Sequence, residues 1–135
     1  MAKIYLDSCL IISLIEGDAT QRQLLKRQLP KHTIYSSELA RLETRLLAIR
    51  TQNQDSLQKF DSFFAACKIV ALGRTVFEQA TLLRANSSLK TPDAIHLAAA
   101  IYAGCHEFWT DDKPLRAITI QSLKVIDWSA LEKME

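Results

Sequence analysis

The residues best suited to chemistry are acidic residues that follow short apolar segments. Asp7 comes directly after the run KIYL (residues 3 to 6), and Asp111 and Asp112 follow the run EFWT (residues 107 to 110). Taking an unpaired carboxylate out of water is costly, so each such acid needs a partner or a role. The structural alternatives are that Asp7 or Ser8 only caps the next helix, and that Thr-Asp-Asp is ordinary turn chemistry.

A third acid lies in the stretch SSELARLETRLLAIR, residues 36 to 50. A projection at about 100° per residue places Glu43 inside an apolar arc, and this arc is predicted to be the buried face. The arc comprises Leu39, Leu42, Leu46, Leu47 and Ile49, and the opposite face carries Arg41, Thr44 and Arg45. An ionised glutamate is rarely buried unpaired. Glu43 therefore has a functional role, unless it extends to solvent or pairs with a nearby arginine.

A fourth acid lies in KTPDAIHLAAAIYAG, residues 90 to 104. The pattern predicts a helix with Thr91 as its cap, Pro92 at the first helical position and Asp93 in the first turn. The helix is apolar nearly all round, so only its amino-terminal end is expected to reach the surface. Asp93 then lies at an edge of the core, although an acid there also simply favours the helix dipole. His96, three positions later, is more typical of a packing residue than of a ligand.

Together these acids indicate a binding site for a divalent cation. Two like charges about 4 Å apart repel by roughly 4 kcal/mol at an effective dielectric of 20, and a whole domain is stable by only about 5 to 15 kcal/mol. Mg²⁺ and Mn²⁺ prefer carboxylate oxygens and remove this repulsion. The same ions promote the hydrolysis of phosphodiester bonds, which is nuclease chemistry.

The elements that must position these acids alternate between short strands and longer helices, a pattern typical of a parallel α/β sheet. In such a sheet, ligands bind beyond the carboxyl ends of the strands, where Asp7 and the pair Asp111 and Asp112 are expected. The predicted strands are 3–6, 32–35, 68–71, 107–110 and 124–126. The predicted helices are 9–15, 20–28, 37–50, 56–66, 75–85 and 92–103, with a helix–helix turn within residues 50–58.

Composition predicts one compact domain in the cytoplasm. The chain has 135 residues, 48% of them hydrophobic, and neither a membrane-spanning apolar run nor the start of a signal peptide. Three cysteines without C-x-x-C spacing argue against a disulfide framework or a structural zinc site, so they are expected to be reduced. The net charge of +2 is too small to indicate a nucleic-acid partner by itself.

Four segments make the sequence resemble the PIN-domain ribonucleases, and within them the VapC-type toxins of toxin–antitoxin pairs. They are IYLDS, YSSELARLE, TPDAIHLAAAI and FWTDDKPL, in the family's order and spacing over nearly the whole chain. The resemblance implies that residues 1–135 form a single PIN domain. It also implies a three-layer α/β/α fold with a short central parallel sheet of about five strands.

The resemblance further implies a metal-dependent endoribonuclease. Asp7, Glu43, Asp93 and Asp112 would hold one or two Mg²⁺ or Mn²⁺ ions, and water would attack the RNA without a covalent nucleophile. Ser8 and Thr110 would support this site, and Asp112 is preferred to Asp111 because it follows Thr110 by two positions. Cys9 stands where the family often has asparagine, which leaves the support of Asp7 open.

Partners follow from the same resemblance. RNA phosphates are expected to meet Arg41, Arg45, Lys113 and Arg116. A cognate antitoxin is expected to cover the active site, and a homodimer is expected as well.

Three other functions remain open at the level of sequence. A stand-alone RNA-processing nuclease and a catalytically silent PIN-fold binding module would carry the same motifs. An aspartyl phosphotransferase would use Asp7 as nucleophile but needs a second acid two residues later, where this chain has Cys9.

Overall fold

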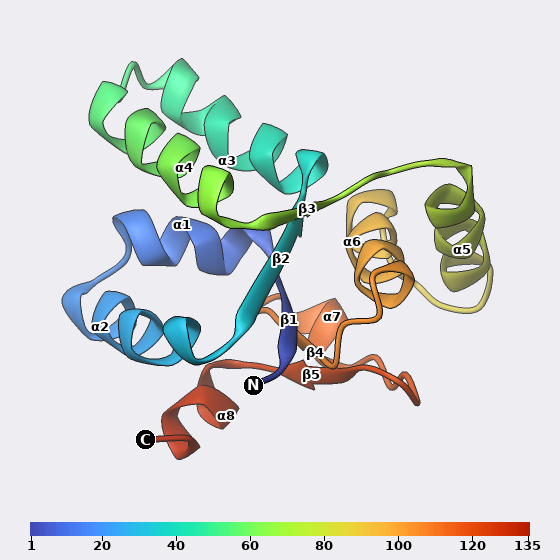
Figure 1. Ribbon diagram of the computed structural model, residues 1–135. Helices are drawn as coiled ribbons and strands as arrows, with labels where there is room; N and C mark the ends of the chain where they lie inside the picture. Colours follow the sequence, from blue (N-terminus) through green and yellow to red (C-terminus); the bar gives the residue numbers. More distant parts are fainter.

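The computed structural model describes residues 1–135 and is built on a five-stranded parallel sheet (Figure 1). The strands are β1 (Lys3–Leu6), β2 (Thr33–Ser37), β3 (Lys68–Val70), β4 (Glu107–Trp109) and β5 (Lys124–Ile126). Their order in the sheet is β3-β2-β1-β4-β5, and every neighbouring pair is parallel. The chain therefore leaves β1 toward β2 on one side and returns to β4 on the other. The carboxyl ends of β1 and β4 lie where the strand order reverses, the usual ligand position in such sheets.

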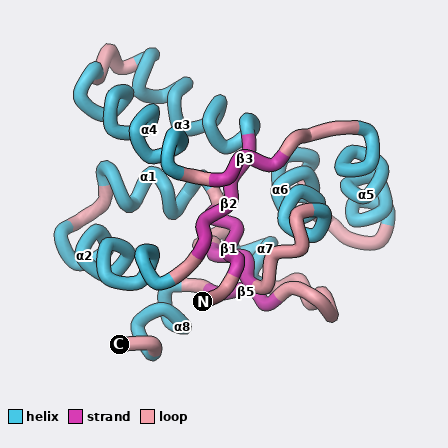
Figure 2. The backbone as a smooth tube through the Cα atoms, viewed as in Figure 1, coloured by secondary structure: helices cyan, strands magenta, loops and turns pink.

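Eight helices connect and flank the strands, as the tube in Figure 2 shows. They are α1 (Ser8–Glu16), α2 (Ala19–Gln28), α3 (Glu38–Arg50), α4 (Gln54–Ala66), α5 (Arg74–Ala85), α6 (Thr91–Tyr102), α7 (Lys113–Arg116) and α8 (Trp128–Lys133), with a 3-10 turn at Leu29–Lys31. Several starts are fixed by side chains that accept a backbone N–H, among them Asp7, Ser37 and Asn53. None of the helices combines the length and apolar character needed to cross a membrane.

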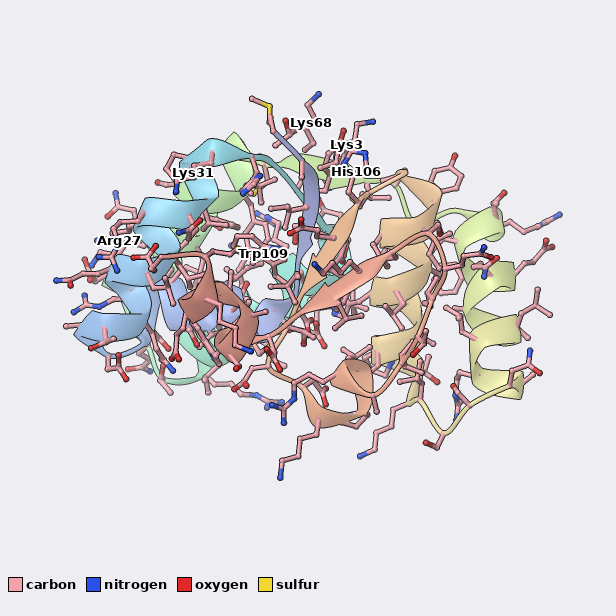
Figure 3. The ribbon with its side chains drawn as sticks, turned by 90° about the horizontal axis from the view of Figure 1, so that it is seen from below. Lys3, Arg27, Lys31, Lys68, His106 and Trp109 are labelled. Atoms are coloured by element: carbon pink, nitrogen blue, oxygen red, sulfur yellow. The ribbon has the colours of Figure 1, made fainter.

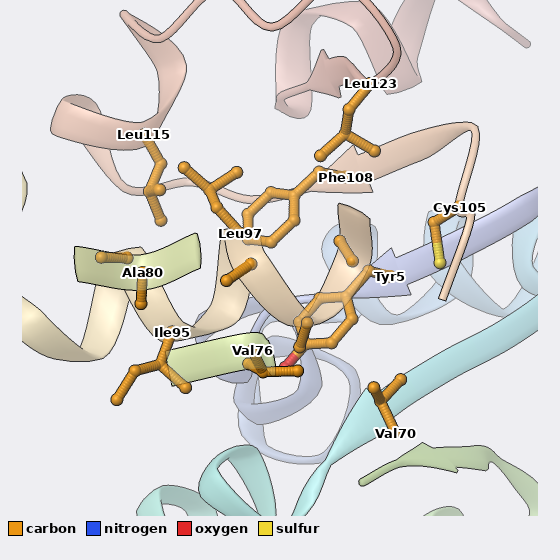
Figure 4. Close-up of a cluster of buried hydrophobic side chains, with 14 of the residues drawn as sticks. Tyr5, Val70, Val76, Ala80, Ile95, Leu97, Cys105, Phe108, Leu115 and Leu123 are labelled. Atoms are coloured by element: carbon orange, nitrogen blue, oxygen red, sulfur yellow. The ribbon is translucent and has the colours of Figure 1, made fainter. Parts of the chain in front are cut away.

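The core has two halves, one on each face of the sheet, because successive side chains of β1 point to opposite faces. Tyr5 packs with Phe108, Leu97 and other residues on the face covered by α5 and α6 (Figure 4). Ile4 and Leu6 point to the other face, against α1, α2 and α4. The result is the expected three-layer α/β/α arrangement.

The two ends of the parallel strands, called here the amino-terminal edge and the carboxyl edge of the sheet, differ in charge. Lys3 begins β1, Lys68 begins β3 and His106 immediately precedes β4, and the three lie together at the amino-terminal edge (Figure 3). The ammonium groups of both lysines lie 5.9 Å from the centre of the Tyr35 ring. The acids predicted to form the site lie at the opposite, carboxyl edge.

The predicted strands and long helices are all present, with ends that differ by at most two residues. The 3-10 turn, α7 and α8 were not predicted, because each is too short to show a helical period. The predicted cap at Thr91 is wrong. Thr91 is the first residue of α6 after Lys90, and its hydroxyl accepts a hydrogen bond of 2.9 Å from Arg84 instead.

The predicted buried face of α3 is also wrong. Thr44, expected on the exposed face, is 1% exposed, whereas Leu42 is 59% exposed. The buried stripe consists of Ala40, Thr44 and Ala48, spaced four residues apart. These small side chains let α3 pack closely on its neighbours α1 and α4. Four of the five residues of the predicted arc are exposed instead: Leu42, Leu46, Leu47 and Ile49.

Candidate active site at the carboxyl edge of the sheet

The local fold of two adjacent strands places Asp7 and Thr110 side by side. Each residue directly follows its strand, β1 or β4, and the backbone N–H of Asp7 donates to the carbonyl of Trp109 at 3.0 Å. The hydroxyl of Thr110 donates to Oδ2 of Asp7 at 2.7 Å. The backbone N–H of Ser8 donates to Oδ1 at 2.8 Å. Asp7 thus caps α1 and also stands at the switch point of the sheet.

Asp7 is 4% exposed, yet no arginine or lysine pairs with it. The only basic side chain within 4.0 Å of it is the imidazole of His96, whose Nε2 lies 3.7 Å from Oδ1. Hydrogen bonds from neutral groups satisfy part of the carboxylate, but they supply no full positive charge. A buried carboxylate in this state still favours a cation nearby.

Glu43 reaches the same place from α3. Its side chain is 30% exposed, and its Oε1 lies 2.6 Å from Nε2 of His96, a buried residue of α6. Burial lowers the pKa of His96, but the hydrogen bond to Glu43 and the charges of Asp7, Glu43 and Asp93 raise it more strongly. The net pKa of His96 is therefore above its ordinary value.

Asp93 and Asp112 complete the acidic group. Asp93 lies in the first turn of α6, where burial, Asp112 and Asp7 together raise its pKa from 3.8 to about 6. Asp112 precedes α7, and its backbone N–H donates to the Thr110 hydroxyl at 3.0 Å. Burial is the largest cause of this rise in pKa, and repulsion by Asp112 and Asp7 adds to it.

The donor set suits a hard divalent cation. No three His, Cys, Asp or Glu side chains are already arranged as a finished metal site. The four acids nevertheless come from four separate elements to one edge of the sheet and offer only oxygen ligands. Oxygen ligands and mutual repulsion between carboxylates fit Mg²⁺ or Mn²⁺ better than zinc, which prefers nitrogen and sulfur.

Cys9 supports the loop that carries the last acid. Its thiol lies 3.5 Å from Oδ2 of Asp7 and 3.7 Å from Oγ1 of Thr110, and it accepts the backbone N–H of Asp111 at 3.4 Å. Burial and the charge of Asp7 raise the pKa of this thiol to about 12, so it stays protonated. The side chain of Asp111 itself is exposed, whereas Asp112 is half-buried.

The four basic residues predicted to contact RNA lie in two places. Arg41 and Arg45 lie on α3, where both pair with Asp61 of α4, at 3.7 and 2.8 Å. Lys113 and Arg116 lie on α7, directly after Asp112, and Arg116 has only a distant pairing of 3.9 Å with Asp127. Lys113 and Arg116 are thus the freer of the two pairs.

Two residues of the site were not predicted in any role, and His96 was expected to be a packing residue rather than a ligand. Tyr5 and Ser37 join His96 in a buried hydrogen-bonded chain that ends at Glu43. Two features of the sequence could have indicated this buried chain. They are a histidine one turn after Asp93 on an otherwise apolar helix, and a tyrosine in the middle of a strand predicted to be buried.

Comparison with known proteins identifies the family. The family model for the PIN domain matches residues 4–120. A toxin–antitoxin complex from Klebsiella pneumoniae has a similar structure, with a TM-score of 0.70 and 24% identity over 89% of this chain and 94% of the other. No curated protein sequence matches the chain.

Two further solved structures share the fold at lower identity. VapBC2 from Rickettsia felis, bound to a promoter DNA fragment, has a TM-score of 0.74 at 16% identity, over 93% of this chain and 98% of the other. VapC20 from Mycobacterium tuberculosis, a Sarcin-Ricin loop cleaving toxin, has a TM-score of 0.70 at 17% identity, over 90% and 98%. The family model covers most of the chain, and the chain therefore belongs to the PIN domain family.

Proposed function

We propose that this chain, as one PIN domain over residues 1–135, is a metal-dependent endoribonuclease and the toxin of a toxin–antitoxin pair. The observation that carries the proposal is the convergence of Asp7, Glu43, Asp93 and Asp112 at one edge of the sheet. His96 Nε2 lies 2.6 Å from Glu43 and 3.7 Å from Asp7, and burial, Asp112 and Asp7 together raise the pKa of Asp93 to about 6. Membership of the PIN family and the likeness to VapC toxins support the same activity.

Each acid has a distinct task in this proposal. Asp7, held by Thr110 and the N–H of Ser8, and Asp93, at the amino terminus of α6, are the firmest ligands for Mg²⁺ or Mn²⁺. Glu43 and Asp112 complete the site. A cation held by these acids would supply activation of water and stabilisation of negative charge on the scissile phosphate. No side chain is needed as a covalent nucleophile.

The substrate is held by basic groups near the acids. In this proposal Lys113 and Arg116, which follow Asp112 on α7, contact phosphates of the RNA beside the acids. Arg41 and Arg45 would have to exchange their pairing with Asp61 for a phosphate, which costs little because these ion pairs are partly exposed.

A protein partner is the second part of the proposal. The solved structures from Klebsiella pneumoniae and Rickettsia felis are toxin–antitoxin complexes. On this chain, Leu42, Leu46 and Ile49 form an exposed apolar stripe on α3 beside Glu43, a feature typical of a protein interface. An antitoxin segment lying on the stripe would pass beside Glu43, which lies on the same helix. A homodimer is proposed as well, and light scattering of the purified chain would reveal it.

Titration of the purified protein with Mn²⁺ tests the enzymatic proposal against a catalytically silent binding module. The nuclease should bind Mn²⁺, and an Asp7→Asn, Asp93→Asn double variant should not. Equal binding by both proteins, or none by either, would favour the silent module. A stand-alone RNA-processing nuclease would also bind Mn²⁺, and it would differ from a toxin in having no antitoxin encoded beside it.

A further inference from the structure

A buried chain of hydrogen bonds connects the start of α3 with the carboxylate of Glu43 later in the same helix. Oγ of Ser37 lies 2.7 Å from the Tyr5 hydroxyl, and this hydroxyl lies 2.7 Å from Nδ1 of His96. Nε2 of His96 then lies 2.6 Å from Oε1 of Glu43. The chain runs through β2, β1, α6 and α3, so it depends on the whole fold rather than on one element.

The direction of the last bond follows from the groups themselves. An ionised carboxylate only accepts hydrogen bonds, so Nε2 of His96 donates to Glu43. In the neutral ring, Nδ1 accepts from Tyr5, and the Ser37 hydroxyl donates to the Tyr5 oxygen. In the protonated ring, the bonds among Tyr5, His96 Nδ1 and Ser37 reverse, but the bond to Glu43 is unchanged. The contact with Glu43 therefore does not depend on the charge of the imidazole.

The inner members of this chain are buried, whereas Glu43 is partly exposed. Tyr5 and Ser37 are 0% exposed and His96 is 1% exposed. The Tyr5 ring stacks on Phe108 with centroids 5.3 Å apart, and burial keeps the pKa of its hydroxyl far above the ordinary value. Glu43 is a long, partly exposed side chain, and His96 is its only hydrogen-bond partner in the protein. Without His96 it would sample several rotamers.

The position of the imidazole suits a role in arranging the acids. Its Nε2 binds Oε1 of Glu43 and lies 3.7 Å from Oδ1 of Asp7, so one buried atom lies between the two carboxylates. Oε2 of Glu43 has no hydrogen-bond partner in the protein and stays available to a ligand. A group that binds one oxygen of a metal-binding carboxylate typically strengthens metal binding by fixing the other.

We propose that His96 is a positioning residue that holds Glu43 at a fixed spacing from Asp7, with Tyr5 and Ser37 holding the imidazole in turn. This inference rests on the proposed function, since it concerns the same cation. It assigns no contact between His96 and the RNA or the cation itself.

Two amide variants separate positioning of Glu43 from mere filling of the core. In His96→Gln the side-chain amide replaces Nε2 and can still donate to Glu43. In His96→Asn the amide replaces Nδ1, so it reaches Tyr5 but not Glu43. We expect Mn²⁺ affinity, measured by electron paramagnetic resonance of free Mn²⁺, to fall about tenfold or more in His96→Asn and to recover largely in His96→Gln. RNA cleavage at limiting Mn²⁺ should follow the same order.

A double-variant comparison shows whether His96 acts through Glu43. In a Glu43→Gln background, the additional His96→Asn change should weaken Mn²⁺ binding no further. Tyr5→Phe keeps the stacked ring but removes the hydroxyl, and it should weaken binding in the same direction by a smaller factor. Tyr5→Phe also provides the test if His96→Asn fails to fold, as judged by circular dichroism.

The outcomes distinguish this inference from the proposed function. If the wild-type protein binds Mn²⁺ and His96→Asn and Tyr5→Phe bind it equally well, the positioning role is wrong and the nuclease proposal stands. If His96→Asn and His96→Gln lose affinity equally, or if His96→Asn adds its full effect to Glu43→Gln, His96 does not act through Glu43. If the wild-type protein binds no Mn²⁺, the proposed function itself fails, and the inference fails with it.

Discussion

Thr110 and Asp7 are joined by a buried hydrogen bond of 2.7 Å, although they lie 103 positions apart in the sequence. The same Thr110 hydroxyl accepts the backbone N–H of Asp112 at 3.0 Å. One side chain thus connects the end of β1, the end of β4 and the start of α7. Two of the four predicted metal ligands owe their relative position to this hydroxyl.

Replacing Thr110 with valine should therefore damage both stability and activity. Valine has nearly the same shape, but it leaves the Asp112 N–H and one oxygen of Asp7 without this partner. Because Thr110 is 0% exposed, we expect a loss of about 1 to 3 kcal/mol in the free energy of unfolding. Urea unfolding measures this loss. Thr110→Ser keeps the hydroxyl and serves as control, and a valine variant as stable and active as the serine variant would contradict the assigned contact.

Asp93 should make the metal-free protein less stable as pH rises. Its pKa is about 6 in the folded protein and ordinarily 3.8, so the folded state binds the proton more tightly. This contribution favours folding below pH 4 and is lost as pH rises through 6, because the ionised carboxylate is partly buried and is repelled by Asp112 and Asp7. At pH 7 in EDTA, Asp93→Asn should be more stable than the wild-type protein by about 1 kcal/mol, a figure reduced for the partial exposure of the group.

Urea unfolding of both proteins at pH 4 and pH 7 measures the effect. The advantage of Asp93→Asn should shrink at pH 4, where the wild-type carboxyl is protonated, and Mn²⁺ should reverse it at pH 7 by stabilising only the wild-type protein. An asparagine variant that is less stable than the wild-type protein in EDTA at pH 7 would contradict repulsion among these acids.

The sequence was sufficient to predict the acids at strand ends, because parallel strands bring their carboxyl ends to one edge. That rule placed Asp7 and the pair Asp111 and Asp112, and the resemblance to the PIN family selected Asp112 from the pair. The hydrogen-bond partner of Glu43 could not be predicted. The contact with His96 joins α3 to α6 across 53 positions, and no local sequence pattern indicates a contact over that distance. The prediction of which face of α3 is buried was wrong for a similar reason. The periodicity of its leucines was read as the core face, whereas close packing on α1 and α4 selected alanine and threonine.

The corrected orientation of α3 predicts that an arginine will destabilise the protein strongly on the buried face of the helix and only slightly on the exposed face. Thr44→Arg would place a large charge in a 1% exposed position and should reduce the free energy of unfolding by about 3 kcal/mol or prevent folding. Leu46→Arg changes a side chain that is 42% exposed and should alter stability by only about 0.5 kcal/mol. Thermal and urea unfolding of the two variants measure the difference, and equal losses would show that the leucine face is buried.

The central claim is that the four acids hold a divalent cation that is used to cleave RNA. The most direct measurement is cleavage of a mixed RNA pool by the purified protein in Mg²⁺ or Mn²⁺, with EDTA and the Asp7→Asn, Asp93→Asn double variant as controls. Asp55→Asn, which changes an exposed acid of α4, controls for the loss of a charge alone. We predict discrete cuts by the wild-type and Asp55→Asn proteins, and none with EDTA or the double variant. Equal cleavage by the wild-type protein and the double variant, or cleavage that persists in EDTA, would contradict the claim.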